Sequence, residues 1–152
     1  MRDATPGDLG RLLELYADLD REMGEYRGRW AHIDTWPEPV AGALGAAIAD
    51  EQIGVFVGTI DDYPVGYAVC EIEDALPQTG GERVGNVRDL FVEPEAREVG
   101  VGEALLLRVI DWLTEHGVRS ADITVSPGHR AAKNFCEENG FVARSITMHS
   151  QW

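Results

Sequence analysis

The most informative stretch of the sequence is Arg97-Glu98-Val99-Gly100-Val101-Gly102-Glu103-Ala104-Leu105. A basic residue and two glycines precede an apolar run with helical spacing, so an RxxGxG pattern opens a helix. Glycine lets the backbone approach a ligand closely, and the free N–H groups at a helix N-terminus bind an anion such as a pyrophosphate. On its own the pattern fits a tight strand-to-helix connection equally well. It is neither a P-loop nor a complete GxGxxG motif.

The neighbouring segments alternate between strand and helix patterns. The predicted helix ends at His116-Gly117, where a glycine follows the last periodic residue. Its buried side consists of Leu105, Leu106, Val109, Ile110, Trp112 and Leu113. Before it, residues 84–92 predict a strand that ends at Pro94, and the β-rich runs 53–60 and 65–72 predict a hairpin.

Helical spacing also marks the N-terminal part of the chain. Thr5-Pro6-Gly7-Asp8 begins a predicted helix that reaches Met23, and a second helix is expected over about residues 40–50. Between them, residues 24–39 form an aromatic-rich loop. At the other end we predict a strand over about 119–125, a short helix that stops at Gly140, and a final strand over 141–152.

Length and composition favour one domain over residues 1–152. The 152 residues are 44% hydrophobic and 26% charged, with a mean hydropathy of −0.20. The net charge of −14 repels nucleic acid, and the absence of a membrane helix or signal-peptide pattern favours a soluble cytoplasmic protein. Cys70 and Cys136 are predicted to be free thiols, with no spacing typical of a metal site.

The negative charge is concentrated in the first two thirds of the chain. Residues 1–96 carry 20 acidic and 7 basic side chains, whereas residues 97–152 carry 7 acidic and 6 basic ones. One interpretation is a cationic substrate on one side of the protein and an anionic cofactor on the other. The alternative is that the acidic residues only keep the surface solvated.

A second motif follows the predicted strand 119–125. The stretch Ser126-Pro127-Gly128-His129-Arg130-Ala131-Ala132-Lys133-Asn134-Phe135-Cys136-Glu137-Glu138-Asn139-Gly140-Phe141 resembles the NxxAxxFYxxxGF helix of the GNAT superfamily of N-acetyltransferases. The RxxGxG turn resembles the same family, and residues 2–8 resemble its first strand and turn. The resemblance implies an α+β fold, with a strongly twisted central sheet and helices on both faces.

The resemblance also implies that the chain binds acetyl-CoA and no metal. The backbone amides of Glu98 to Gly102 would hold the pyrophosphate with Arg97 beside them, and main-chain groups of the strand 84–92 would face the pantetheine and the acetyl carbonyl. The cofactor-binding residues expected on this basis are Leu90, Phe91, Val92, Arg97, Glu98, Val99, Gly100, Val101, Gly102, His129, Ala132 and Phe135.

Two residues depart from the second motif. Cys136 stands where the family usually has the tyrosine credited with protonating the leaving thiolate, and His129 stands where asparagine is usual. Cys136 is either the general acid or a small packed side chain with water as the proton source. His129 either contacts CoA or packs in the first helical turn. Lys133 either contacts a CoA phosphate or lies on a solvated helix face.

Asp89 is the predicted catalytic base, because an ammonium must lose its proton before its nitrogen attacks a thioester. The polyamine acetyltransferases of the family carry an acidic residue at the matching place. An ion pair with Arg88, Arg83 or Arg108 is the alternative role, and Glu71 and Glu73 are second-line bases. The following residues either cover a cationic acceptor or, for the aromatic ones, belong to the core: Glu22, Glu25, Tyr26, Trp30, His32 and Trp36.

These observations predict direct acetyl transfer from acetyl-CoA to an amine of a small molecule or a protein. One alternative is an acetyl-CoA-binding module without efficient turnover. A nucleotide site for ATP or NAD is disfavoured, because the acidic ribose partner and the strand–helix repeats are missing. A homodimer is expected if a partner covers Trp152.

Overall fold

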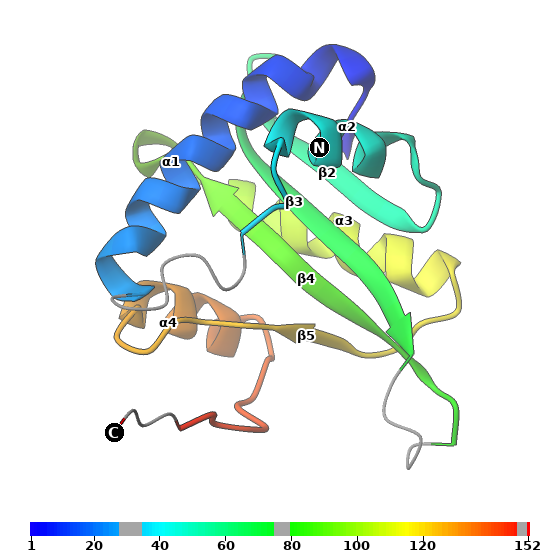
Figure 1. Ribbon diagram of the computed structural model, residues 1–152, viewed down its shortest axis with the longest axis vertical. Helices are drawn as coiled ribbons and strands as arrows, with labels where there is room; N and C mark the ends of the chain where they lie inside the picture. Colours follow the sequence, from blue (N-terminus) through cyan, green and yellow to red (C-terminus); the bar gives the residue numbers. More distant parts are fainter. Residues whose placement is uncertain (28–34, 75–79, 149–151) are drawn as a thin grey trace.

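A five-stranded sheet forms the middle of the computed structural model, which describes residues 1–27, 35–74, 80–148 and 152 (Figure 1). The strands are β1 (Arg2–Asp3), β2 (Ile53–Ile60), β3 (Tyr63–Asp74), β4 (Arg83–Val92) and β5 (Ala121–Ile123). They lie in sequence order, and neighbouring strands are antiparallel except that β5 runs parallel to β4. The first strand and the hairpin predicted from the sequence are therefore confirmed.

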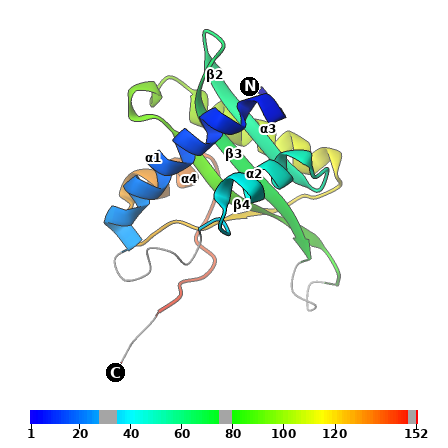
Figure 2. The same cartoon turned by 45° about the horizontal axis from the view of Figure 1, so that its top comes forward.

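Helices cover both faces of the sheet. The short 3-10 turn η1 (Pro6–Asp8) leads into α1 (Leu9–Arg27), which lies with α2 (Val40–Ala49) on one face. On the other face, α3 (Val101–Glu115) follows a second turn, η4 (Pro94–Ala96), and α4 (Arg130–Glu138) follows β5 (Figures 1 and 2). The predicted fold class is confirmed. Among the described residues, no helix combines the length and apolarity needed to cross a membrane.

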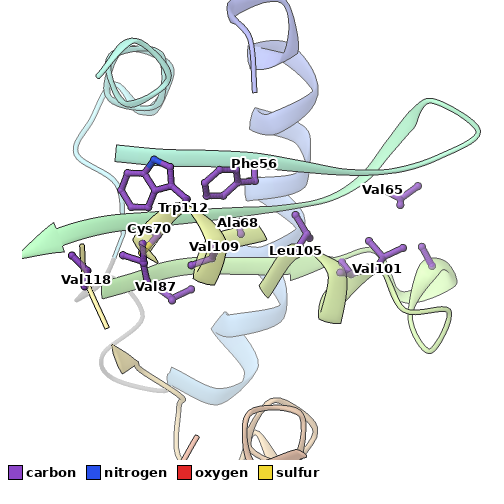
Figure 3. Packing of buried hydrophobic residues seen from close by; sticks show 13 residues of the cluster. Phe56, Val65, Ala68, Cys70, Val87, Val101, Leu105, Val109, Trp112 and Val118 are labelled. Carbon is purple, nitrogen blue, oxygen red and sulfur yellow. The ribbon is translucent and has the colours of Figure 1, made fainter. Parts of the chain in front are cut away.

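Two separate cores hold these layers together. Figure 3 shows the core between the sheet and α3, where Leu105, Val109 and Trp112 meet strand residues such as Phe56 and Ala68. The approach is close at Gly58, where a Cβ atom would lie 2.7 Å from Val101. On the opposite face, apolar residues of α1 and α2 pack on the sheet around Tyr67. This burial of apolar side chains holds the helices against the sheet.

The prediction of a final strand over residues 141–152 is wrong for its described part. Residues 141–148 follow α4 without forming a strand, and residues 149–151 lie outside the described residues. A strand exists only when a neighbour satisfies its backbone N–H and C=O groups, and β5 is shorter than predicted, at three residues. The segment has the composition of a strand, but among the described residues it has no strand to pair with.

Asp8 fixes the start of α1 to the first strand. Its carboxylate accepts two hydrogen bonds from Arg2, at 2.7 and 2.8 Å, and two from the backbone N–H and hydroxyl of Thr5. These bonds, above all those from the Arg2 guanidinium, lower the pKa of Asp8 below its usual range. The stabilisation is therefore complete above the pKa of an unfolded aspartate and is lost as the pH falls through the lower, folded-state value.

Replacing Asp8 with asparagine is expected to lower the free energy of unfolding by about 1–2 kcal/mol at pH 7, since charge-assisted hydrogen bonds are lost. The deficit should shrink below about pH 4, because the aspartate of the unfolded wild-type chain takes up a proton there, whereas the folded-state carboxylate stays ionised to lower pH. Urea unfolding at pH 7 and pH 3 measures both values. A deficit that is the same at both pH values would show that the charge of Asp8 does not carry the effect.

Candidate functional site

A cavity opens where β4 and β5 separate. The two strands pair only over residues 85–87 and 121–123, after which β4 continues to Val92 and β5 ends. The cavity has a volume of about 600 Å³ and is lined on one side by Leu90, Phe91 and Val92. Residues 123–126 and one face of α4, including Ala132 and Phe135, form the opposite wall. The cavity thus passes between the separated strands and reaches the start of α3.

The RxxGxG turn forms the end of this cavity beside α3. Gly100 is the N-cap of α3 with a φ of 87°, and Glu98 has a φ of 64°, so the turn holds two residues in the left-handed region. At Gly102, which lines the cavity, a Cβ atom would lie 3.2 Å from Phe135. The glycines of the turn therefore leave the backbone without side-chain cover at the N-terminus of a helix, where N–H groups bind anions. This arrangement fits a pyrophosphate group.

The predicted cofactor residues do not all reach the cavity in the same way. Leu90, Phe91, Val92, Arg97, Glu98, Gly102, His129, Ala132 and Phe135 line it. Val99 is exposed, and Val101 points into the core beneath α3. Gly100 does not line the cavity either, so a role in cofactor binding through the backbone of the turn stays a prediction for these three residues.

Arg97 connects the turn to α1. Its Nε donates to the carbonyl oxygen of Val92 at 2.8 Å, and its Nη2 lies 2.5 Å from a carboxylate oxygen of Glu22. The other oxygen of Glu22 is 3.5 Å from Nε2 of His129, and Tyr26 stacks on the His129 ring at 4.3 Å. The C-terminal half of α1 is thereby held against both sides of the cavity.

The charge of Glu22 is balanced mainly by Arg97. Burial lowers the pKa of His129 despite the opposing effect of the Glu22 carboxylate, and the charge of Arg97 adds to the lowering, so the imidazole is neutral at pH 7 and contributes no charge. Glu22 lines the cavity, and its carboxylate contacts Arg97 and His129; that it also favours a cationic acceptor stays a prediction. Sequence reasoning missed these contacts, because they join residues 75 and 107 positions apart.

Asp89 lies at the inner end of the cavity and is buried. Its Oδ2 accepts a hydrogen bond from Nε1 of Trp36 at 2.7 Å and another from the hydroxyl of Tyr67 at 3.1 Å. Burial, together with the nearby Asp89 carboxylate, raises the pKa of Tyr67 well above its usual value, so Tyr67 remains a donor. Two neutral donors therefore hold this carboxylate in one orientation.

Arg88 precedes Asp89 on β4, and two glutamates, Glu71 and Glu73, lie further along β3, opposite Asn86 and Val84. The Arg88 guanidinium stacks over Trp36 at 4.1 Å and donates to Glu71 at 3.2 Å and to the carbonyl oxygen of Thr35. Glu73 accepts from Asn86 at 2.8 Å. Of the other arginines proposed as ion-pair partners for Asp89, Arg83 donates to a backbone carbonyl and Arg108 contacts Asp3. Glu71 and Glu73 are not among the residues that line the cavity, which makes them weaker candidates for a base than Asp89.

Cys136 lines the cavity with a side chain that is almost completely buried. Burial raises the pKa of its thiol, so it is protonated at pH 7 and can act as a donor. Lys133 is exposed and pairs with Glu137 one turn further along α4, which favours the solvated-face interpretation. Trp30 and His32 of the aromatic loop lie outside the described residues.

The model of the acetyltransferase (GNAT) family matches residues 12–141, which is most of the chain. The chain belongs to the GNAT family. The family identified from the two motifs is thus confirmed, and the cavity between β4 and β5 lies between the same two motifs in this GNAT chain.

Curated relatives of this GNAT chain are also acetyltransferases by name. It is 25% identical to an uncharacterized N-acetyltransferase of Methanocaldococcus jannaschii, covering 96% of this chain and 62% of that protein. It is 28% identical to aminoglycoside N(6')-acetyltransferase type 1 of Stenotrophomonas maltophilia, covering 86% of this chain and 82% of that one. The chain therefore spans less than two thirds of the first relative and most of the second.

Solved structures share the fold of this GNAT chain. A tetramutant of the BH1408 protein of Bacillus halodurans superposes with a TM-score of 0.86 at 22% identity, covering 99% of this chain and 98% of that one. A predicted acetyltransferase of Clostridium acetobutylicum, solved with acetyl-CoA, gives a TM-score of 0.76 at 14% identity and covers 99% of this chain and 94% of that one. At these identities the likeness concerns the fold.

Proposed function

We propose that this chain transfers the acetyl group of acetyl-CoA to the amine of a cationic acceptor by direct attack. The observation that carries the proposal is one continuous cavity that joins an anion-binding helix N-terminus to a buried carboxylate, Asp89. A phosphate-bearing cofactor and an amine have opposite charges, and the two ends of this cavity match them. The family and the names of the relatives support the same reaction.

The residues present fit acetyl-CoA. The bare backbone of residues 98–102 would hold the pyrophosphate, and main-chain groups of Leu90 to Val92 would receive the pantetheine and the acetyl carbonyl. When bound, acetyl-CoA supplies an activated acetyl thioester. Backbone N–H groups at the carbonyl would stabilise the negative charge that develops during attack. The structural neighbour solved with acetyl-CoA supports this choice of cofactor.

Asp89 is the proposed base. A buried carboxylate held by Trp36 and Tyr67 has a fixed position from which to accept the ammonium proton, directly or through a water molecule. Glu71 and Glu73 lie further along β3, opposite Asn86 and Val84, and their negative charge favours a cationic acceptor. No covalent enzyme intermediate is required, since the amine nitrogen attacks the thioester itself.

The proton for the leaving sulfur comes from Cys136 or from water. Cys136 lies in the cavity wall and is protonated at pH 7, but its packing among buried residues explains its presence without a catalytic role. We favour the packing role, with water as the proton source.

Cys136→Ala should therefore change turnover by only a few-fold and lower stability by about 1 kcal/mol, as for the loss of one small buried side chain. Steady-state rates and thermal unfolding measure both effects. A positioned acid contributes about 100-fold or more, so a loss of that size in folded protein with normal acetyl-CoA affinity would make Cys136 catalytic.

Cationic acceptors should react faster than neutral ones of similar size. The carboxylate of Asp89 and the net charge of −14 attract a cation, and the relative named as an aminoglycoside acetyltransferase acts on an acceptor class of this sign. The preference in kcat/KM should decrease as salt is added, because screening weakens long-range attraction. An amine with an added carboxylate that reacts faster than its amide counterpart would contradict this selection.

The function is tested by supplying acetyl-CoA with a panel of amines and measuring free thiol release. Release that depends on one class of amine supports the proposal. Tight acetyl-CoA binding without thiol release across polyamines, aminoglycosides, amino acids and peptides would favour the second candidate, a binding module without turnover. The observation that favours this second candidate is that Cys136 replaces the tyrosine usual in the family.

A further inference from the structure

Arg88 precedes Asp89 on β4 and lines the same cavity, and the proposed reaction gives its side chain no role. The side chain is 25% exposed, and its guanidinium stacks over Trp36 at 4.1 Å. Nε1 of the same indole donates to Asp89 at 2.7 Å. Because the guanidinium and the proposed base contact one indole ring, an amine that reaches Asp89 brings its neighbouring atoms close to Arg88.

The guanidinium of Arg88 has more donors than partners. Of the five N–H groups of an arginine, one from Nη1 reaches Glu71 and one from Nη2 reaches the carbonyl oxygen of Thr35, both at 3.2 Å. Both bonds are long for a charged donor. Nε is buried and has no acceptor, the only such side-chain atom found in the described part of the chain. Arg88 therefore keeps donors with which it can bind an oxygen of a ligand.

The charges around Arg88 decide which kind of oxygen fits. The Glu71 carboxylate offsets the positive charge of Arg88, so a second carboxylate would gain little there and would be repelled by Asp89. An ammonium group would be repelled by the guanidinium and cannot accept its hydrogen bonds. An uncharged oxygen, as in a hydroxyl, ether or carbonyl group, accepts these bonds without either repulsion.

We propose that Arg88 is a specificity-determining residue that donates to an uncharged oxygen of the acceptor, a few atoms from the reacting amine. The substrate class is then an amine that carries a hydroxyl, ether or carbonyl oxygen, and plain alkyl amines are poorer acceptors. Further positive charge on the acceptor lies away from Arg88. The inference rests on the proposed function, in which the amine reacts beside Asp89.

Two amines of similar size test the inference, 3-aminopropan-1-ol and butylamine, which has a methyl group in place of the hydroxyl. The measured quantity is the ratio of their kcat/KM values with acetyl-CoA. Arg88→Met removes every donor and keeps an unbranched apolar stem over Trp36. It should lower the ratio by about tenfold or more, because hydrogen bonds from a charged group are lost.

The ratio separates recognition from support of the site. A variant that only displaced Trp36 and Asp89 would slow both amines together and leave the ratio unchanged. Arg83→Met is the matched control, since it removes the same charge from the same strand at a residue that does not line the cavity. It should keep the wild-type ratio. Equal ratios in the wild type and Arg88→Met overturn the inference.

A third amine, 3-aminopropanoate, tests the charge of the oxygen. It should react more slowly than 3-aminopropan-1-ol, and a faster reaction would overturn the assignment of an uncharged oxygen. A protein that acetylates other amines but not 3-aminopropan-1-ol likewise overturns the inference and leaves the proposed function intact. An absence of thiol release with every amine overturns the proposed function, and the inference with it.

Discussion

Asp89→Asn should lower turnover by about 100- to 10,000-fold at pH 7, the range that a positioned general base contributes. Asparagine keeps the shape of the side chain and an oxygen that can accept from Trp36 and Tyr67, but it cannot take a proton. The loss should therefore appear in kcat, with acetyl-CoA affinity and folding unchanged. Steady-state kinetics with saturating acetyl-CoA, together with thermal unfolding, measure these quantities.

The pH profile distinguishes a base from a structural carboxylate. Without a base, only the free amine reacts, and its fraction rises about tenfold per pH unit below an ordinary amine pKa near 10.4. The deficit of Asp89→Asn should thus shrink steadily as the pH is raised. A deficit that is constant with pH would show that Asp89 only positions its neighbours.

Glu73→Gln is the matched control for Asp89→Asn. It removes a carboxylate from the same face of the sheet, where Glu73 accepts from Asn86, and should change turnover by only a few-fold. A larger loss in Glu73→Gln than in Asp89→Asn would reassign the base.

The helix after the RxxGxG turn was predictable because two signals agree within it. The glycines mark its start, and the apolar residues at helical spacing mark its buried side, as found in α3 (Val101–Glu115). The final strand was not predictable in the same way. Residues 141–148 have the alternation of a strand, but a strand also needs an edge to pair with, and alternation alone does not supply one.

Alternation along β4 would also have misplaced Asp89. Strict period two puts Val87, Asp89 and Phe91 on one face, whereas the register with β3 shifts between Val69 and Cys70. Val87 consequently packs in the core beneath α3, and Phe91 packs in the core beneath α1 and α2, on the same side as Tyr67. The irregularity brings Asp89 within reach of Tyr67 and Trp36. Its position depends on strand pairing, which composition and spacing do not encode.

Gly100→Asp should weaken acetyl-CoA binding at least tenfold, about 1.4 kcal/mol. A Cβ atom at Gly100 meets no other atom within 4 Å, so the loss does not come from a clash within the protein. It comes from a negative charge placed at the N-cap of α3, where the proposed pyrophosphate binds and where the helix dipole otherwise favours an anion. Calorimetric titration with acetyl-CoA measures the dissociation constant.

Gly100→Asn isolates the charge in that experiment. Both variants place a similar side chain at a φ of 87°, where asparagine and aspartate are tolerated better than most residues, so they share the backbone strain. The asparagine variant should lose less affinity, and the difference between the two should decrease with added salt because screening weakens the repulsion. Equal dissociation constants for the aspartate and asparagine variants would mean that no anionic group binds at this turn, and the cofactor would then have to be held elsewhere in the cavity.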